Sequence, residues 1–129
     1  MEYADKHFRG KRIDNGEWVF GYFVKDPRGQ CRIYWQPFNE ATSNTYHFVK
    51  PETVGQYIRK GRVYEGDIVK FRGDDYDEYQ TSVIQSRGII DGDFGDYNTW
   101  LIDWAIDADY IFETIGNIHD NPELLESGS

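Results

Sequence analysis

The stretch NGEWVFGYFVKDPRGQCRIYWQPF, residues 15–38, has the pattern of a β-hairpin. Its Asn-Gly pair at 15–16 is a tight-turn signal, and the EWVFGYFV that follows is rich in the aromatic and β-branched residues that favour strands. The Asp-Pro-Arg-Gly at 26–29 predicts a second turn, because Pro27 has the backbone angle that the second turn position requires. Residues 31–35, CRIYW, are the expected returning strand. The stretch therefore predicts a mainly β fold.

The segment GRVYEGDIVKFRGDD, residues 61–75, has a similar pattern, which predicts a short strand, a turn at 65–67 and the strand DIVKF. At 129 residues the chain suits one compact domain over residues 1–126 or two small lobes, about 1–60 and 61–126. Aromatic residues make up 17% of it, so we expect rings to fill the core. Residues 127–129 are interpreted as a tail.

One phrase occurs twice, as ETVGQY at residues 52–57 and ETIGNI at 113–118. A glycine in mid-phrase disfavours a helix by ~1 kcal/mol relative to Ala, whereas in a strand it indicates a bulge. We therefore predict that both copies are strands with a bulge at the glycine, with Val54 and Ile115 pointing into the core. For the first copy, a short helix beginning at Pro51 is the alternative.

The run IDWAIDADYIF, residues 102–112, alternates apolar and polar residues, which predicts a half-buried strand. A helix is the alternative, because Trp100 and Trp104 are also at helical spacing. PELLE, residues 122–126, predicts one last helical turn capped by Asn121. The expected fold is thus a small mixed β fold with few short helices.

The segments FRGKRIDNGEWVFGYFV, ETVGQY, VYEGDIVKF and ETIGNIHDNPELLE follow one another along the chain. In this order they closely resemble the YopX-like family of bacteriophage and prophage proteins. The resemblance implies a mostly β fold with a small barrel in the second half and a phage origin, and it implies no chemistry. Only IRKGR separates ETVGQY from VYEGDIVKF, where the family carries a longer linker. Residues 74–110 match no family feature, so we expect this protein's own specificity there.

Charge is uneven along the chain, whose net charge is -9. Residues 1–73 hold 13 Lys or Arg and 9 Asp or Glu, whereas residues 74–129 hold one and 14. A solvated acidic face is the favoured interpretation. The alternatives are head-to-tail self-association, a basic host partner, and mimicry of a polyanion such as DNA.

Residues with catalytic or metal-binding chemistry are scattered. The three histidines, with the single Cys31, have no zinc spacing, and no glycine loop for a phosphate is present. Cys31 lies in a predicted strand and is expected to be a buried thiol. The segment DGDFGDYNTW, residues 91–100, lacks the ligand order of a calcium loop. We therefore expect no metal, no cofactor and no enzymatic activity; an acidic pair from this segment that holds magnesium and cleaves a phosphodiester is a disfavoured alternative.

Two groups of side chains are candidates for binding. Arginines beside rings can pair with phosphate and stack on a base, so a small phosphorylated ligand is possible for the first group. The net charge disfavours nucleic acid. The second group would form an acidic surface. The first group is Arg9, Lys11, Arg12, Arg32, Tyr34 and Trp35, and the second is Asp74, Asp75, Asp77, Glu78, Asp91, Asp93 and Asp96.

The expected location is the host bacterial cytoplasm, because the lone cysteine fits a reducing compartment and no signal peptide or run of ~20 apolar residues is present. We expect a non-enzymatic phage accessory protein that binds a host or phage protein, in host takeover or counter-defence. The partner would be a basic host protein or a second copy of the chain. The alternative is a small-molecule binder that sequesters a host nucleotide signal; an acidic DNA mimic is less favoured.

Overall fold

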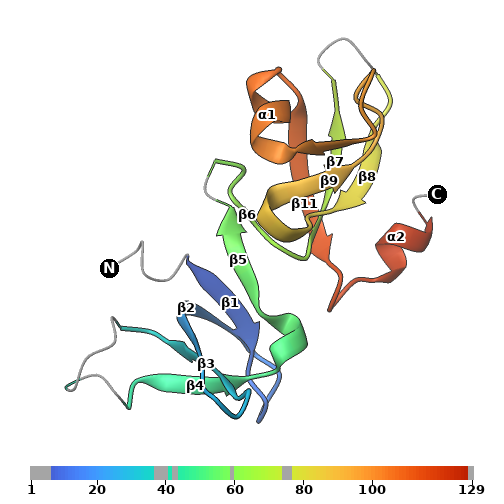
Figure 1. Cartoon of the computed structure of the whole chain (residues 1–129). Helices are drawn as coiled ribbons and strands as arrows, with labels where there is room; N and C mark the ends of the chain where they lie inside the picture. The colour runs from blue at the N-terminus through green and yellow to red at the C-terminus, as the bar shows by residue number, and fades with distance from the viewer. Residues whose placement is uncertain (1–6, 37–40, 42–43, 59, 74–76, 128–129) are drawn as a thin grey trace. The chain divides into compact units, whose positions relative to one another are not determined.

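The computed structural model describes residues 7–36, 41, 44–58, 60–73 and 77–127. The chain divides into two compact units, Met1–Tyr57 and Ile58–Ser129, which are drawn in Figure 1. Eleven strands and two short α-helices are found in the described residues, which confirms the mainly β fold. In this part of the chain, neither helix has the length and apolar character needed to cross a bilayer.

The first unit is an antiparallel sheet with the strand order β4-β3-β2-β1-β5. A 3₁₀ helix at Pro51–Thr53 precedes the last of these strands. The strands are β1 (Phe8–Lys11), β2 (Trp18–Lys25), β3 (Cys31–Tyr34), β4 (Tyr46–Val49) and β5 (Gly55–Ile58).

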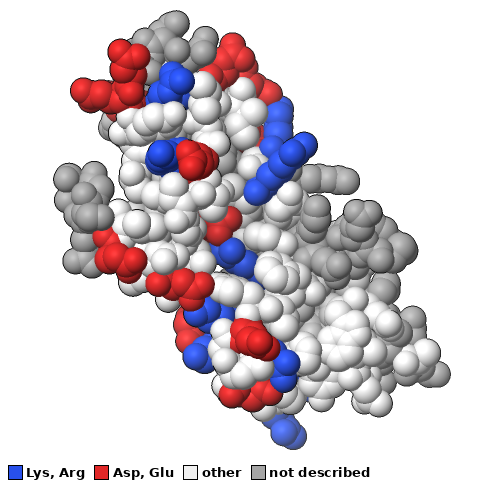
Figure 2. All heavy atoms as spheres, turned by 180° about the vertical axis from the view of Figure 1, so that it is seen from behind, with Lys and Arg blue, Asp and Glu red and all other residues white. Residues whose placement is uncertain are grey.

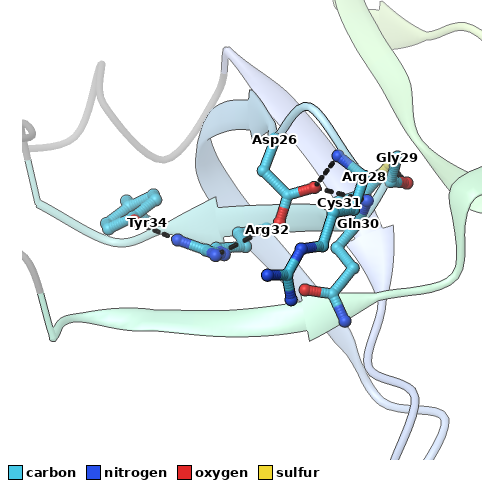
Figure 3. A network of polar contacts seen from close by, with 7 residues as sticks. All are labelled: Asp26, Arg28, Gly29, Gln30, Cys31, Arg32 and Tyr34. Carbon is cyan, nitrogen blue, oxygen red and sulfur yellow. Dashed lines mark hydrogen bonds and ion pairs between the residues drawn. The ribbon is translucent and has the colours of Figure 1, made fainter.

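The predicted hairpin is confirmed as β2 and β3, which pair from Tyr22 opposite Tyr34 to Lys25 opposite Cys31. Asp26 fixes the turn between them. One oxygen of its carboxylate accepts hydrogen bonds from the backbone N–H groups of Arg28 and Gln30, both at 2.9 Å (Figure 3). An aspartate at the first turn position commonly closes the backbone in this way.

The sheet curls until the end of β1 meets β4. Arg12 forms a bridge with Val49, and the backbone N–H of Ile13 donates to the Phe48 carbonyl at 3.0 Å. β1 and β4 come so close here that a side chain at Gly10 would be crowded, because a Cβ at this position would lie 3.1 Å from the Val49 side chain. The core inside the curl contains buried Cys31, Ile33 and Val49, with Phe8, Val19, Phe23 and Val54 packed against them. Cys31 is thus buried, as predicted.

The second unit contains a three-stranded sheet, in the order β11-β7-β8, and the pair β9-β10. The small barrel expected in the second half is not found among the described residues, because these strands form two separate sheets and no closed barrel. β7 is the central strand, and its Ile68, Val69 and Phe71 are fully buried. The elements are β6 (Val63–Tyr64), β7 (Asp67–Arg72), β8 (Gln80–Val83), a 3₁₀ helix (Ser86–Gly88), β9 (Ile89–Asp91), β10 (Thr99–Leu101), α1 (Ile102–Asp107), β11 (Ile111–Asn117) and α2 (Glu123–Ser127).

The strand predicted to begin at Ile102 is wrong, because residues 102–107 form α1. Ile102 and Ala105 are fully buried and Ile106 packs against the same core, so the apolar residues follow the helical spacing i, i+3, i+4. In the predicted strand, Trp104 would share a face with Ile102 and Ile106, whereas in the helix it faces outward and is 56% exposed. The alternative helical interpretation was therefore correct.

The two copies of the repeated phrase have different structures. The second is the predicted bulged strand: in β11, Thr114 pairs with Val69 and Gly116 with Ile68, which leaves Ile115 as the extra residue. The first copy begins in the 3₁₀ helix and becomes a strand only at its glycine, so the prediction of a bulged strand over its whole length is wrong. Pro51 at the first position favours the helical turn there.

The aliphatic residues of the two phrases are less buried than predicted, whereas the C-terminal helix is present as predicted. Val54 and Ile115 are half-buried, not fully inside the core. The predicted last helix is present as α2, which packs closely on β11: a Cβ at Gly116 would lie 2.9 Å from a Leu124 methyl group. Ser127, expected in the tail, belongs to α2, and residues 128–129 lie outside the described residues.

Candidate functional site

A cavity in the first unit lies between two turns and the edge strand β4. It has a volume of about 580 Å³ and is lined by residues 12–14, 28–31 and 46–49 together with Pro51. Residues 12–14 begin the turn after β1, and residues 28–31 end the hairpin turn and open β3. Three segments that are distant in sequence therefore meet because the sheet curls.

Two rings on β4 form the aromatic part of this cavity. Tyr46 and Phe48 project to the same side of the strand because they are two residues apart, and their ring centroids lie 5.2 Å apart, edge to face. Phe48 keeps 38% of its surface exposed. The Arg32 guanidinium lies 5.1 Å from the Tyr46 ring and 5.4 Å from the Phe48 ring. A hydrogen bond to the Tyr34 hydroxyl and an ion pair with Asp26, both at 3.3 Å, hold Arg32 there (Figure 3).

The cavity's charged groups are two arginines and one carboxylate. Arg12 makes a bidentate contact with Asp14, at 2.9 and 2.6 Å, which lowers the pKa of the carboxyl and raises that of the guanidinium. Among the described residues the Arg28 guanidinium has no hydrogen-bond or ion-pair partner. Figure 3 shows it extending away from the Asp26 carboxylate that binds its backbone N–H. The lining thus carries one surplus positive charge.

His47 is neutral in this environment. Burial lowers the pKa of its imidazole, and the nearby positive charge of Arg12 lowers it further, while Asp14 acts in the opposite direction. Its ring lies 4.8 Å from the Trp35 ring. His47 therefore contributes a polar but uncharged group at neutral pH.

Only one of the six predicted binding residues, Arg12, lines the cavity. Arg9 and Lys11 lie over the Trp18 ring instead, at 4.5 and 5.4 Å, and Arg9 is only 7% exposed. Arg32 and Tyr34 support the rings, as described above, and Trp35 contacts His47. The sequence reasoning missed the lining residues Arg28, Tyr46 and Phe48.

The second unit has an acidic hollow of about 290 Å³, lined by residues 78–80 with Gly73, Asp93, Gly95 and Tyr110. The Gln80 amide fixes one side, because its oxygen accepts from the Asp93 N–H at 2.7 Å and its nitrogen donates to the Asp93 carbonyl at 3.0 Å. The Asp93 carboxylate accepts one hydrogen bond, from the Gly95 N–H at 3.1 Å. The lining of the hollow therefore includes two carboxylates, Glu78 and Asp93, and two tyrosines, Tyr79 and Tyr110.

The other predicted acidic residues have separate positions. The Asp91 carboxylate accepts hydrogen bonds from Thr99 at 3.1 Å and Gln85 at 3.0 Å, so it ties β9 to its neighbours. Asp77 and Asp96 are exposed. Asp74 and Asp75 lie outside the described residues. No group of three His, Cys, Asp or Glu side chains suited to a metal ion occurs within the described ranges.

Exposed rings extend from the acidic hollow. Tyr110 contacts Trp100 edge to face at 6.2 Å, and Tyr97 stacks on Trp100 at 5.7 Å while remaining 57% exposed. Phe94 is the buried ring that contacts both Trp100 and Tyr110. A continuous set of aromatic side chains thus joins the hollow to the surface of the second unit.

The two units differ in net charge, although the difference is smaller than that between residues 1–73 and residues 74–129. Residues 1–57 hold 8 Lys or Arg and 7 Asp or Glu, whereas residues 58–129 hold 6 and 16. On the face drawn in Figure 2, the basic and acidic side chains are interspersed and neither sign forms one continuous patch. Ion pairs within the second unit, Lys60 with Asp107 and Lys70 with Glu113, use part of its positive charge.

The fold and these surfaces define a class: a small, mainly β protein of two units, each with a hollow lined by rings and charged side chains. The family model described as YopX protein matches residues 7–126, and the chain belongs to this family, which confirms the resemblance. The crystal structure of protein yopX from Bacillus subtilis is similar, with a TM-score of 0.58 and 19% identity over 93% of this chain and 98% of that one. No curated protein shows significant similarity to the chain.

Proposed function

We propose that the chain is a bacteriophage accessory protein that acts in the bacterial cytoplasm by binding, without catalysis, a protein with basic surface side chains. The observation that carries this proposal is the acidic hollow of the second unit, whose lining includes Glu78 and Asp93 together with Tyr79 and Tyr110. The phage origin rests on the family resemblance.

A lysine or arginine side chain fits the chemistry of this hollow. The Glu78 carboxylate has no partner among the described residues, so it is available to a cation. Tyrosine rings add cation–π attraction, worth about 0.5–2 kcal/mol. Lys70 and Arg72 already approach the Tyr79 ring, at 4.9 and 5.5 Å, which indicates that this ring accepts cations.

The exposed rings supply the apolar part of the proposed interface. Tryptophan and tyrosine are enriched among the residues that dominate binding energy at protein interfaces. Tyr97 is connected to the hollow through Trp100, so a partner that inserts a cation there can also cover this ring. The surrounding negative charge would accelerate association with a basic protein.

A different protein is a better partner than a second copy of the chain. Head-to-tail pairing needs a basic surface on the first unit, but that unit carries a surplus of only one positive charge. Arg12 and Arg32 are moreover paired with Asp14 and Asp26 inside the unit, so their charges are already neutralised locally.

The test compares the immobilised chain, its double variant Glu78→Gln/Asp93→Asn and the control Asp107→Asn in bacterial lysate at 50 and 500 mM salt. Asp107 is an exposed carboxylate of the same unit outside the hollow. We expect one basic protein to be retained by the wild type and the control at low salt, and lost from the double variant and at high salt. Equal retention by all three proteins would refute the proposal. Sedimentation at both salts measures self-association, whose dependence on Glu78 and Asp93 would instead identify a second copy as the partner.

A further inference from the structure

We propose that the first unit has a separate small-molecule site, which binds a compound with one flat aromatic ring and one phosphate group, as in a nucleoside monophosphate. This site is the cavity between the two turns and β4. Its volume of about 580 Å³ lies within the range of about 300–1,000 Å³ that is usual for small-molecule sites.

The ring of the ligand is recognised by Phe48 and Tyr46. These rings are held edge to face by their position on β4, and the Phe48 ring is partly open to solvent. Arg32 contacts both rings and is itself fixed by Asp26 and Tyr34, so the platform is ordered before a ligand binds. A flat heterocycle stacks on such rings with little dependence on its hydrogen-bonding pattern.

The phosphate is recognised by Arg28. Its guanidinium has no partner among the described residues, whereas its backbone is fixed by the hydrogen bond to Asp26. Arg12 adds a second guanidinium on the opposite turn, where Asp14 neutralises it. The lining therefore has a net charge of +1, which attracts an anion, and a guanidinium can pair with a phosphate group through two parallel hydrogen bonds.

The site is independent of the proposed protein interface because all of its residues lie between positions 12 and 51, within the first unit. Glu78→Gln/Asp93→Asn should leave the ligand affinity unchanged. Conversely, the loss of ligand binding should leave the salt-sensitive protein binding unchanged. Failure of one proposal is therefore distinguishable from failure of the other.

The experiment is a calorimetric titration of the full chain with the common nucleoside monophosphates, the matching nucleosides and inorganic phosphate. Arg28→Ala and Phe48→Ala are compared with Lys25→Ala, a control that removes an exposed cation of the same hairpin outside the cavity. Amide chemical shifts in ¹H–¹⁵N spectra locate the bound ligand, and the expected changes are at Gly29, Gln30 and Phe48.

We expect saturable binding of at least one monophosphate, weakened about tenfold or more by Arg28→Ala and by Phe48→Ala and less than about twofold by Lys25→Ala. The nucleoside should bind about tenfold more weakly, and phosphate alone should not saturate the site. The proposal is overturned if no monophosphate binds, if nucleoside and monophosphate bind equally, if Arg28→Ala and Lys25→Ala behave alike, or if the shift changes lie outside the cavity.

Discussion

Gly21 is the residue at which β2 changes partner, and replacing it with alanine should strongly destabilise the first unit. Residues 18–21 pair with β1, whereas residues 22–25 pair with β3. The φ angle of Gly21 is +154°, and a Cβ there would lie 2.0 Å from the carbonyl oxygen of Tyr34. Real Cβ atoms essentially never come within 3.0 Å of such an atom. β3 would have to move by about 1 Å, which exceeds the tolerance of its hydrogen bonds to β2.

The cost has two parts. A side chain at this φ angle adds about 1–3 kcal/mol of backbone strain. The forced displacement of a packed strand adds a further ~1–3 kcal/mol. The expected loss in the free energy of unfolding is therefore about 2–6 kcal/mol, a large fraction of the 5–15 kcal/mol typical of a folded domain.

Gly16→Ala is the matched control, because Gly16 also has a positive φ, +74°, but a Cβ there would meet no atom within 4 Å beyond its chain neighbours. It should cost only the strain of about 1–2 kcal/mol. Both variants are compared with the wild type by urea unfolding, followed by circular dichroism and tryptophan fluorescence. If the two variants agree within about 0.5 kcal/mol, steric contact with Tyr34 is not what requires glycine at position 21.

Three further predictions concern the core, the pH dependence and catalysis. Phe71→Ala should lower the free energy of unfolding by about 3–5 kcal/mol in urea titrations, because Phe71 is fully buried, whereas exposed Trp104→Ala should change it by less than about 1 kcal/mol. The lowered pKa of His47 means that the unfolded chain binds its proton first, so stability should fall as the pH drops below about 6.5, and His47→Gln should show a smaller fall between pH 8 and 5. Incubation with phosphodiesters and magnesium or manganese should give no turnover; metal-dependent turnover that Asp91→Asn/Asp93→Asn abolishes would contradict a non-catalytic role.

The sequence predicts a local element correctly where the spacing of its apolar residues fits only a strand or only a helix. It fails where the spacing fits both. The β2–β3 hairpin was predictable because turn residues separate two long aromatic strands. In contrast, the α1 segment fits both periods: Ile102, Trp104 and Ile106 alternate as in a strand, whereas Ile102, Ala105 and Ile106 share one helical face. Burial decides between these patterns, since Ala105 is fully buried and Trp104 is not. Which of these residues becomes buried depends on the other elements that pack against the segment, and the local sequence does not contain this information.

The candidate sites were less predictable because they depend on the curl of the sheet. Arg9, Lys11 and Arg12 are near one another in sequence, yet the first two lie over Trp18 and only Arg12 lines the cavity. The signals for Tyr46 and Phe48 were present as alternate residues of YHFV, a pattern that places them on one side of a strand. Their approach to the turn that contains Arg28 depends on pairing between distant segments.

The hairpin and the proposed ligand site depend on the same carboxylate. One oxygen of Asp26 accepts the N–H groups that close the turn, while the other pairs with Arg32 beneath the Tyr46 and Phe48 rings. The turn bonds fix the backbone of Arg28, whose guanidinium is the proposed phosphate contact. Asp26 thus orders both the cationic and the aromatic sides of the cavity, so the residues that make this stretch a hairpin also position its binding groups.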